Sequence, residues 1–238
     1  MIRGYSFKVP ASTSNLGAGF DALSLALEKH LRITIESSDC TEIVARGVDS
    51  GSIPTTPDNL ILRVANSLAA KRNRPLRAFR MTIENEIPLA RGMGSSAAAI
   101  IAGVTCYEAV AEDRLSEQDI FRHALEFESH PDNLAAALRG GLVATAVASG
   151  GEVLIAKLAV AEGVRPVLVI PAFELSTEKA RGVLPQTYSR MDTVYNIQRS
   201  ALTIAALTTG AWTMLREAMR DRIHQPYRAP LIPGFEEI

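Results

Sequence analysis

A short segment near the middle of the chain carries residue types that can bind an anion. Gly92 and Gly94 can adopt positive φ angles and let the backbone come close to a ligand. Ser95 and Ser96 follow as potential N-caps, and the alanine-rich run behind them favours a helix from about 97 to 110. The free N–H groups and the positive dipole end of such a helix attract anions, so a phosphate chain is a natural occupant.

The same letters have a simpler interpretation. A Walker A loop needs a lysine after its last glycine, and Ser95 stands there instead, so this segment is not an ordinary P-loop. A turn with a serine N-cap ahead of a core helix would look the same, and such turns are common. Taken alone, the segment leaves both interpretations open.

The residues around this segment predict strands and helices in an irregular mixture. Short runs alternate between apolar and polar residues as strands do, and others repeat apolar residues at helical spacing. Pro10 is expected to end the first strand, and residues 130–133 are expected to interrupt a helix. We expect strands at 5–9, 31–36, 42–46, 79–83, 142–147, 153–159 and 167–170, an apolar run at 22–27, and helices at 60–72, 97–110, 116–128, 177–183 and 191–219.

This mixture favours an α+β fold over a doubly wound parallel sheet, because strands and helices do not alternate with regular βαβ spacing. A length of 238 residues allows one large domain or two small ones. The pair Gly150-Gly151 is the best linker candidate. We therefore expect an N-terminal domain over 1–150 and a C-terminal domain over 151–238.

Composition narrows the classes of function. The chain has 25 Lys and Arg against 26 Asp and Glu, which argues against binding nucleic acid through bulk positive charge. Cys40 and Cys106 form no CxxC pair, and the histidines show no zinc-ligand spacing, so we expect reduced thiols in a cytoplasmic protein. No apolar signal segment is visible at the start, and the most apolar stretch, 97–107, is too short to span a bilayer. We expect neither a nucleic acid nor a membrane as partner.

Together with its neighbours, the central segment resembles a known family. Residues 88–96, Pro-Leu-Ala-Arg-Gly-Met-Gly-Ser-Ser, are similar to the phosphate-binding motif of the GHMP kinases (galactokinase, homoserine kinase, mevalonate kinase, phosphomevalonate kinase). Met93 stands where leucine is commoner, an exchange of similar volume. Four further segments follow the order of the members that act on homoserine: 10–21, 128–133 with Gly140-Gly141, 176–185, and 224–234. Five segments in order over nearly the whole chain make a specific signal.

The resemblance implies a fold and an incomplete C-terminal part. The N-terminal domain would be like domain 2 of ribosomal protein S5, the C-terminal domain would be ferredoxin-like, and ATP would lie between them. Family members carry a third Gly-rich motif, roughly Ser-Gly-x-Gly-Pro, beyond the position of Ile238. We therefore expect a fragment or a truncated product with reduced activity and stability. Family members are often dimers, so a homodimer is also an expectation.

The resemblance also implies ligands for the nucleotide. Backbone N–H groups at the start of the helix would hold the β- and γ-phosphates, and Mg²⁺ would take hard oxygen ligands while keeping several waters. The metal ligands would be Ser96 and Glu128, with Ser95 and Glu126 as near alternatives because a slip by a residue or two cannot be settled from sequence. The nucleotide site would comprise Pro88, Leu89, Ala90, Arg91, Gly92, Met93, Gly94, Ser95 and Ser96.

L-Homoserine carries an ammonium, a carboxylate and a hydroxyl, and a selective pocket must pair all three. Asp21 and Asp132 are candidates for the ammonium, while Arg181 and Arg228 suit the carboxylate because a guanidinium fork matches it. Asp132 is also the candidate general base, although a loose phosphoryl-transfer transition state needs little early deprotonation. The remaining candidates for orienting the substrate are Asn15, His130, Asn133 and Thr177. Among all of these residues, catalytic roles are assigned to Ser96, Glu128, Asp132 and Arg181.

Three alternatives remain. A GHMP kinase for mevalonate or a sugar would have no use for two aspartates facing an ammonium. A nucleotide-binding module without kinase activity would follow from loss of the third motif. An RNA-binding domain of the S5 type would share only the fold, and the near-neutral charge argues against it.

Overall fold

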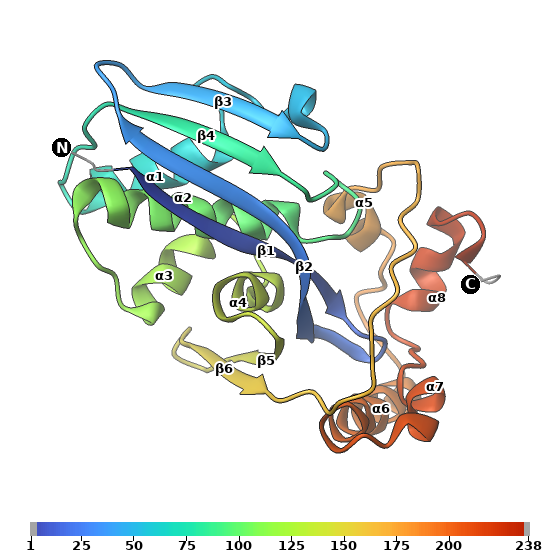
Figure 1. Ribbon diagram of the computed structural model, residues 1–238. Coiled ribbons are helices and arrows are strands. Elements are labelled where there is room, and N and C mark those ends of the chain that lie inside the picture. Colours follow the sequence, from blue (N-terminus) through green and yellow to red (C-terminus); the bar gives the residue numbers. More distant parts are fainter. Residues whose placement is uncertain (1–3, 236–238) are drawn as a thin grey trace.

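One long strand, β2 (Gly19–Ser37), organises the sheet in this computed structural model, which describes residues 4–235. It pairs antiparallel with β1 along one side, and with β4 and β5 at different points along its length (Figure 1). The sheet order is β3-β4-β2-β5-β6, with β1 paired to β2. The other strands are β1 (Tyr5–Asn15), β3 (Glu42–Gly47), β4 (Phe79–Asn85), β5 (Leu142–Val147) and β6 (Val153–Leu158).

The core lies between this sheet and the helices packed on it. Figure 1 shows α1 and α2 along one face of the long strands, with α4 below them between β1 and β5. The helices are α1 (Leu60–Lys71), α2 (Ser95–Ala111), α3 (Glu117–Ala124), α4 (Pro131–Arg139), α5 (Thr177–Gly182), α6 (Arg190–Thr209), α7 (Leu215–Ala218) and α8 (Gln225–Arg228), with 3-10 turns at Ser50–Ser52, Trp212–Met214 and Ala229–Leu231.

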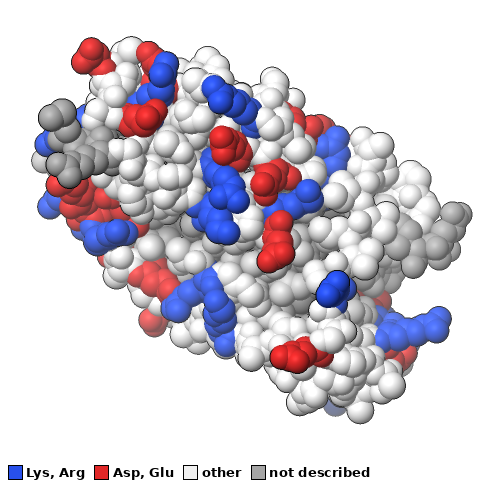
Figure 2. Space-filling model, in the orientation of Figure 1, with Lys and Arg blue, Asp and Glu red and all other residues white. Residues whose placement is uncertain are grey.

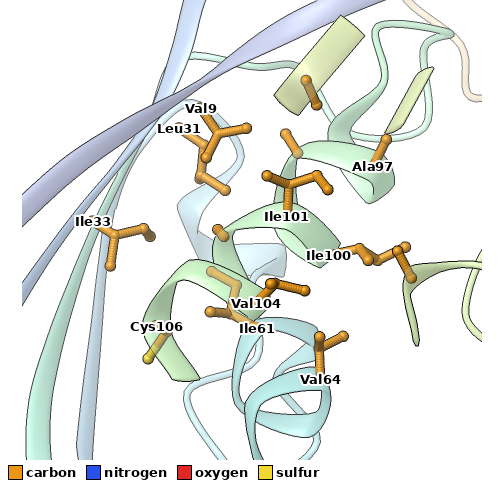
Figure 3. Packing of buried hydrophobic residues seen from close by; sticks show 14 of the residues in the cluster. Val9, Leu31, Ile33, Ile61, Val64, Ala97, Ile100, Ile101, Val104 and Cys106 are labelled. Atoms are coloured by element: carbon orange, nitrogen blue, oxygen red, sulfur yellow. The ribbon is translucent and has the colours of Figure 1, made fainter. Parts of the chain in front are cut away.

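Helix α2 is apolar on nearly all sides because it is enclosed by other elements. In Figure 3, Val9, Leu31 and Ile33 point from the strands toward Ile101 of this helix. On its other side α2 packs against α1, and Gly103 permits the close approach because an added Cβ would lie 2.6 Å from the Cβ of Val64. Each fully buried aliphatic side chain of this kind contributes about 1.5–3 kcal/mol. The start of α2 is therefore held by a rigid core.

Several boundaries differ from the sequence predictions for identifiable reasons. Pro10 does not end the first strand, because the register shifts between Pro10 and Ala11 and a proline is tolerated at such an irregularity. The apolar run at 22–27 and the strand at 31–36 belong to the single strand β2. The predicted helix at 191–219 ends at Thr209, where Gly210 takes a φ of 78°.

Three further predictions were wrong. Ser95 and Ser96 do not cap α2 from outside, because the helix begins at Ser95 and its N-cap is Gly94 in the left-handed conformation. Residues 167–170 form no strand, and the side chains of this extended segment are exposed, with Val167 at 88%. The helix expected at 116–128 ends at Ala124, and a new helix starts at Pro131, a residue suited to the first helical position.

The fold mixes α and β elements as predicted. The sheet is antiparallel except for the β3–β4 pair. Gly150 and Gly151 lie in the turn between β5 and β6, which pair directly at Val147 and Val153. Residues 153–158 thus extend the sheet, and the division into 1–150 and 151–238 stays a prediction.

Within residues 4–235, no helix combines the length and the apolar character needed to cross a membrane. On the face seen in Figure 2, acidic and basic side chains are interspersed, in keeping with the net charge of -1.

Candidate active site

A cavity of about 930 Å³ opens in front of the N-terminal end of α2. The start of α4 and residue Glu128 contribute to its wall, and the segment from Val167 to Arg181 covers another side together with Arg228. These segments lie far apart in the sequence, so only the tertiary structure creates the cavity. A cavity of this size accommodates a small-molecule ligand.

The turn before α2 exposes backbone to this cavity. Ala90, Gly92 and Gly94 have φ angles of 54°, 71° and 68°, which curl the chain tightly ahead of the helix. No side chain caps α2, so the N–H groups of its first turn lack a capping partner from a side chain. Gly92 has open space where a Cβ would stand, whereas a Cβ on Gly94 would lie 2.1 Å from Ser12 Oγ. Gly92 faces open space, and Gly94 is needed for close packing.

Neighbouring segments hold the turn in place. The Ser12 N–H donates to the carbonyl of Met93 at 3.1 Å, which ties the turn to β1. Asp49 Oδ2 accepts from the Leu89 N–H at 2.9 Å and from Arg91 Nη1 at 3.1 Å. The Leu175 N–H donates to the carbonyl of Ala90 at 3.1 Å. The turn is thus fixed from three sides before any ligand arrives.

Two oxygen-bearing side chains beside the turn could hold a metal ion. Ser96 is exposed, Glu128 is partly buried, and both line the cavity, as does Ser95. The alternative Glu126 instead pairs with Lys71 on the surface and is not part of the cavity wall. Among the described residues no group of three or more His, Cys, Asp or Glu could hold a metal. The donor set fits Mg²⁺, which commonly takes one or two protein ligands and completes its shell with phosphate oxygens and water.

The first turn of α4 brings two predicted residues to the cavity. Asp132 is 2% exposed and accepts a hydrogen bond from the N–H of Asn133 at 2.7 Å. Burial raises the pKa of Asp132, and the nearby carboxylate of Asp21 raises it further. Asn133 Oδ1 accepts from Ser12 Oγ at 2.8 Å, and its Nδ2 donates to Ser14 Oγ at 3.1 Å. These two bonds connect α4 to β1, so the carboxyl group of Asp132 is held in a fixed place.

Asp21 and Arg181 form an ion pair beside the cavity. Arg181 donates from Nη1 and Nη2 to the two carboxylate oxygens at 3.1 and 2.5 Å, and Arg181 Nε is buried without a hydrogen-bond partner. His130 Nε2 lies 3.7 Å from Asp21 Oδ2, and its Nδ1 lies 3.6 Å from Glu128 Oε1. Asn15 supports this arrangement, because its side chain accepts from the N–H of Asp21 at 3.0 Å.

A second arginine approaches from the C-terminal part. Arg228 donates from Nε to the carbonyl of Ala180 at 2.9 Å. Its guanidinium carbon lies 5.2 Å from the ring centre of Phe20, and that of Arg181 lies 5.4 Å from the same ring. Burial lowers the pKa of Arg228, and the positive charge of Arg181 lowers it further. Because both guanidiniums lie against Phe20, they are close enough to bind one anionic group, such as a carboxylate, together.

The structure brings most of the predicted residues together. Pro88 and Asp21 do not line the cavity, nor does the alternative metal ligand Glu126, and Asp21 contacts the cavity through its pair with Arg181. Sequence reasoning missed Ser12, Ser14, Phe20 and Asp49, which position the residues above. The first three lie within the segment 10–21 that carried the resemblance, whereas no pattern singled out Asp49.

Comparisons with known proteins agree with this geometry. Residues 59–141 match the family model described as the GHMP kinases N terminal domain. A homoserine kinase of Solibacter usitatus is 44% identical over 98% of this chain and 77% of its own length. A homoserine kinase of Moorella thermoacetica is 42% identical over 97% of this chain and 78% of its own length. The chain therefore belongs to the GHMP kinase family, and the relatives that it resembles in this way carry the name homoserine kinase.

Solved structures show the same relationship. The crystal structure of homoserine kinase from Cytophaga hutchinsonii matches with a TM-score of 0.80 and 25% identity, over 100% of this chain and 78% of that one. A Streptococcus pneumoniae phosphomevalonate kinase in complex with phosphomevalonate and AMPPNP matches with a TM-score of 0.64 at 14% identity, over 96% of this chain and 80% of that one, and shares the fold alone. The comparisons confirm that the chain is a GHMP kinase and that it is most like the members named homoserine kinase among those compared.

Proposed function

We propose that this chain transfers the γ-phosphate of ATP to the side-chain hydroxyl of L-homoserine, giving O-phospho-L-homoserine and ADP, a step of threonine biosynthesis. The observation that carries the proposal is the set of residues that line one cavity. Its wall combines an uncapped helix start with acidic side chains and two arginines, so a polyphosphate and an amino acid can lie next to each other.

The nucleotide end of the cavity would bind the phosphates through the backbone from Gly92 to Ser96. The first-turn N–H groups and the helix dipole stabilise negative charge there. Ser96 and Glu128 would hold Mg²⁺, whose charge offsets the charge on the phosphate oxygens during transfer. The rigid turn means that these donors need little reorganisation.

The other end of the cavity would bind the amino-acid part of homoserine. Arg181 and Arg228 would hold the carboxylate, and Asp132 with Asp21 would attract the ammonium. The ion pair between Asp21 and Arg181 would then contact both charges of the substrate. The ammonium would lie beside Asp21, and the carboxylate would lie beside Arg181. The residues proposed to orient the substrate are Asn15, His130, Asn133 and Thr177.

The hydroxyl proton has two routes. Asp132 could accept it, and burial raises the pKa of Asp132, which makes its carboxylate a stronger base than usual. A loose transition state would let the proton pass to a phosphate oxygen late in the transfer. In either case Asp132 would orient the acceptor.

The finer features expected from the family belong to the same proposal. They are an S5-like N-terminal domain over 1–150, a ferredoxin-like C-terminal part over 151–238, a homodimer and a cytoplasmic location. The location is supported by two free cysteines, Cys40 at the surface and Cys106 in the core.

A coupled ADP-release assay with a panel of hydroxyl acceptors tests the function. We expect Mg²⁺-dependent ADP release with L-homoserine, and only background rates with mevalonate or galactose. Release with mevalonate or galactose but not with homoserine would indicate another GHMP kinase. Tight nucleotide binding without release for any acceptor would indicate a binding module.

A further inference from the structure

We propose that His224 is a positioning residue, which orients Arg228 toward the carboxylate of the substrate, and that Asp221 holds His224 in place. The inference rests on the proposed function, because the carboxylate is that of homoserine. His224 precedes the short helix α8, and Arg228 lies in its last turn, four residues further along. His224 is 5% exposed, so its ring is enclosed by the residues that it contacts.

The protonation state of His224 follows from its neighbours. Nε2 lies 2.9 Å from the carbonyl oxygen of Gly17, and a carbonyl can only accept, so Nε2 carries the hydrogen. The unprotonated Nδ1 then faces Arg228 Nη1 at 3.5 Å, and a guanidinium can only donate. The imidazole therefore connects the turn between β1 and β2 to the arginine.

This connection completes the orientation of Arg228. Its Nε donates to the carbonyl of Ala180 and its Nη1 faces His224, so two acceptors on different segments set the plane of the guanidinium. Arg228 lines the cavity, and its other N–H groups can meet a carboxylate there. Without His224 the side chain would keep the hydrogen bond from Nε to Ala180 and the contact with Phe20, but no acceptor would hold Nη1.

Asp221 anchors His224 from behind. Its side chain is fully buried, and Oδ2 accepts from the N–H groups of Ile223, His224 and Gln225 at 3.2, 2.7 and 2.6 Å. Its Oδ1 accepts from Asn196 Nδ2 of α6 at 2.6 Å. Hydrogen bonds to an ionised carboxylate are stronger than those between neutral groups, and Asp221 accepts four of them. The loop that carries His224 is thus fixed to α6.

Phe20 joins this assembly to the remainder of the carboxylate site. The imidazole of His224 stacks on the Phe20 ring with centroids 5.1 Å apart and an interplanar angle of 22°. The guanidiniums of Arg181 and Arg228 approach the same ring. His224 and Arg228 from one segment and Arg181 from another therefore meet on one aromatic side chain, next to Asp21.

The test measures KM separately for homoserine and ATP in His224→Ala. We expect the homoserine KM to rise about tenfold, with the ATP KM and kcat within about twofold of wild type. His224→Asn places an acceptor oxygen near the position of Nδ1 and should recover much of the affinity. His123→Asn is the matched control, because His123 is equally buried, at 4% exposed, and is no part of the cavity wall.

Two further measurements separate positioning from a general loss of structure. In an Arg228→Ala background, adding His224→Ala should change the homoserine KM by less than about twofold, since the residue through which it acts is gone. For 3-amino-1-propanol, which is homoserine without its carboxylate, His224→Ala should leave kcat/KM unchanged. An unchanged homoserine KM in His224→Ala, additivity with Arg228→Ala, or equal losses for both acceptors would each overturn the inference.

The failure of this inference and the failure of the proposed function give different results. If wild type phosphorylates homoserine and His224→Ala does so with the same KM, only the positioning role is wrong. If wild type binds homoserine without turnover, the dissociation constant from calorimetry replaces KM in every comparison. If wild type neither binds nor phosphorylates homoserine, the proposed function and the inference are both wrong.

Discussion

Of the two carboxylates that follow α3, the one that pairs with a surface lysine does not line the cavity. Glu126 and Glu128 are two residues apart, yet Glu126 pairs with Lys71 at the surface while Glu128 lies in the cavity wall. His130 Nδ1 lies 3.6 Å from Glu128 and brings the carboxylate into the cluster that includes Asp21. Of the two carboxylates that sequence spacing left open, Glu128 is therefore the one that we propose as the metal ligand.

The metal role of these residues gives the first prediction. Ser96→Ala and Glu128→Gln should each lower Mg²⁺-dependent turnover by about tenfold or more, because each removes one of the two proposed protein ligands. Glu126→Gln is the control and should stay within about twofold of wild type. Rates measured over a series of Mg²⁺ concentrations would show the defect, and wild-type rates in Glu128→Gln would exclude this metal ligand.

Three histidines, of which His123 and His224 are buried and His30 is partly buried, give a prediction about stability and pH. Burial is the largest cause that lowers the pKa of His30, His123 and His224. The unfolded chain, with histidine pKa values near 6.5, then binds more protons than the folded chain as pH falls through that region. The free energy of unfolding should therefore decrease between pH 7.5 and 5.5, where most carboxylates stay ionised.

Urea unfolding at several pH values measures this effect. The midpoint should move to lower urea as the pH falls, and His123→Asn should flatten the dependence because it removes one of the three groups. A midpoint that rises on acidification over this range would contradict the lowered pKa values of these three histidines.

At the scale of elements, the start of α2 depends on how β1 approaches it. Ser12 of β1 donates its N–H to Met93 and places its Oγ where a Cβ on Gly94 would stand, 2.1 Å away. β1 and β2 also carry Asn15, Phe20 and Asp21 at the turn between them. The same pair of strands thus supports both the phosphate turn and the amino-acid end of the cavity.

Two glycine variants test this arrangement. Gly94→Ala should lower the free energy of unfolding by about 2 kcal/mol or more, because left-handed strain adds to a clash with Ser12. Gly92→Ala suffers the strain alone, since nothing lies within 4 Å of its Cβ, and should lose about 1 kcal/mol. Chemical unfolding of both variants provides the comparison, and equal losses would show that the contact with Ser12 is unimportant.

At the scale of the molecule, apolar burial is distributed unevenly. The hydrophobic core is made of residues between Val9 and Val153, with partly buried neighbours as far as Ile155. Beyond residue 160, the buried hydrophobic residues in the described part of the chain are Ala206 and Ala218, while Val167 and Met191 are 88% and 70% exposed. The segment from 160 to 235 therefore gains less stability from burial than the sheet and its helices.

Hydrogen exchange should reveal this difference. Amides of β4 and α2 should exchange last, near the rate set by global unfolding, and amides of residues 160–176 and α6 should exchange orders of magnitude faster. Mass spectrometry of peptic fragments gives the rates. Protection of α6 equal to that of α2 would show that the two regions unfold together.

Local patterns in the sequence were sufficient for the class of fold and for the family. Period-two alternation predicted β4 closely, and apolar residues at helical spacing predicted α1, because both periodicities depend on residues near one another in the chain. Five short segments indicated the GHMP kinases, because each motif is local and their order along the chain can be read directly from the sequence.

The tertiary structure alone decided the partners and several boundaries. Pro10 could remain in a strand because β2 accommodates an irregular register there. Asp21 meets Arg181, Ser12 meets Asn133, and His224 meets Gly17 across separations of 160, 121 and 207 residues. No periodicity reports such contacts, since they depend on how distant segments pack and on which buried polar groups then need a partner.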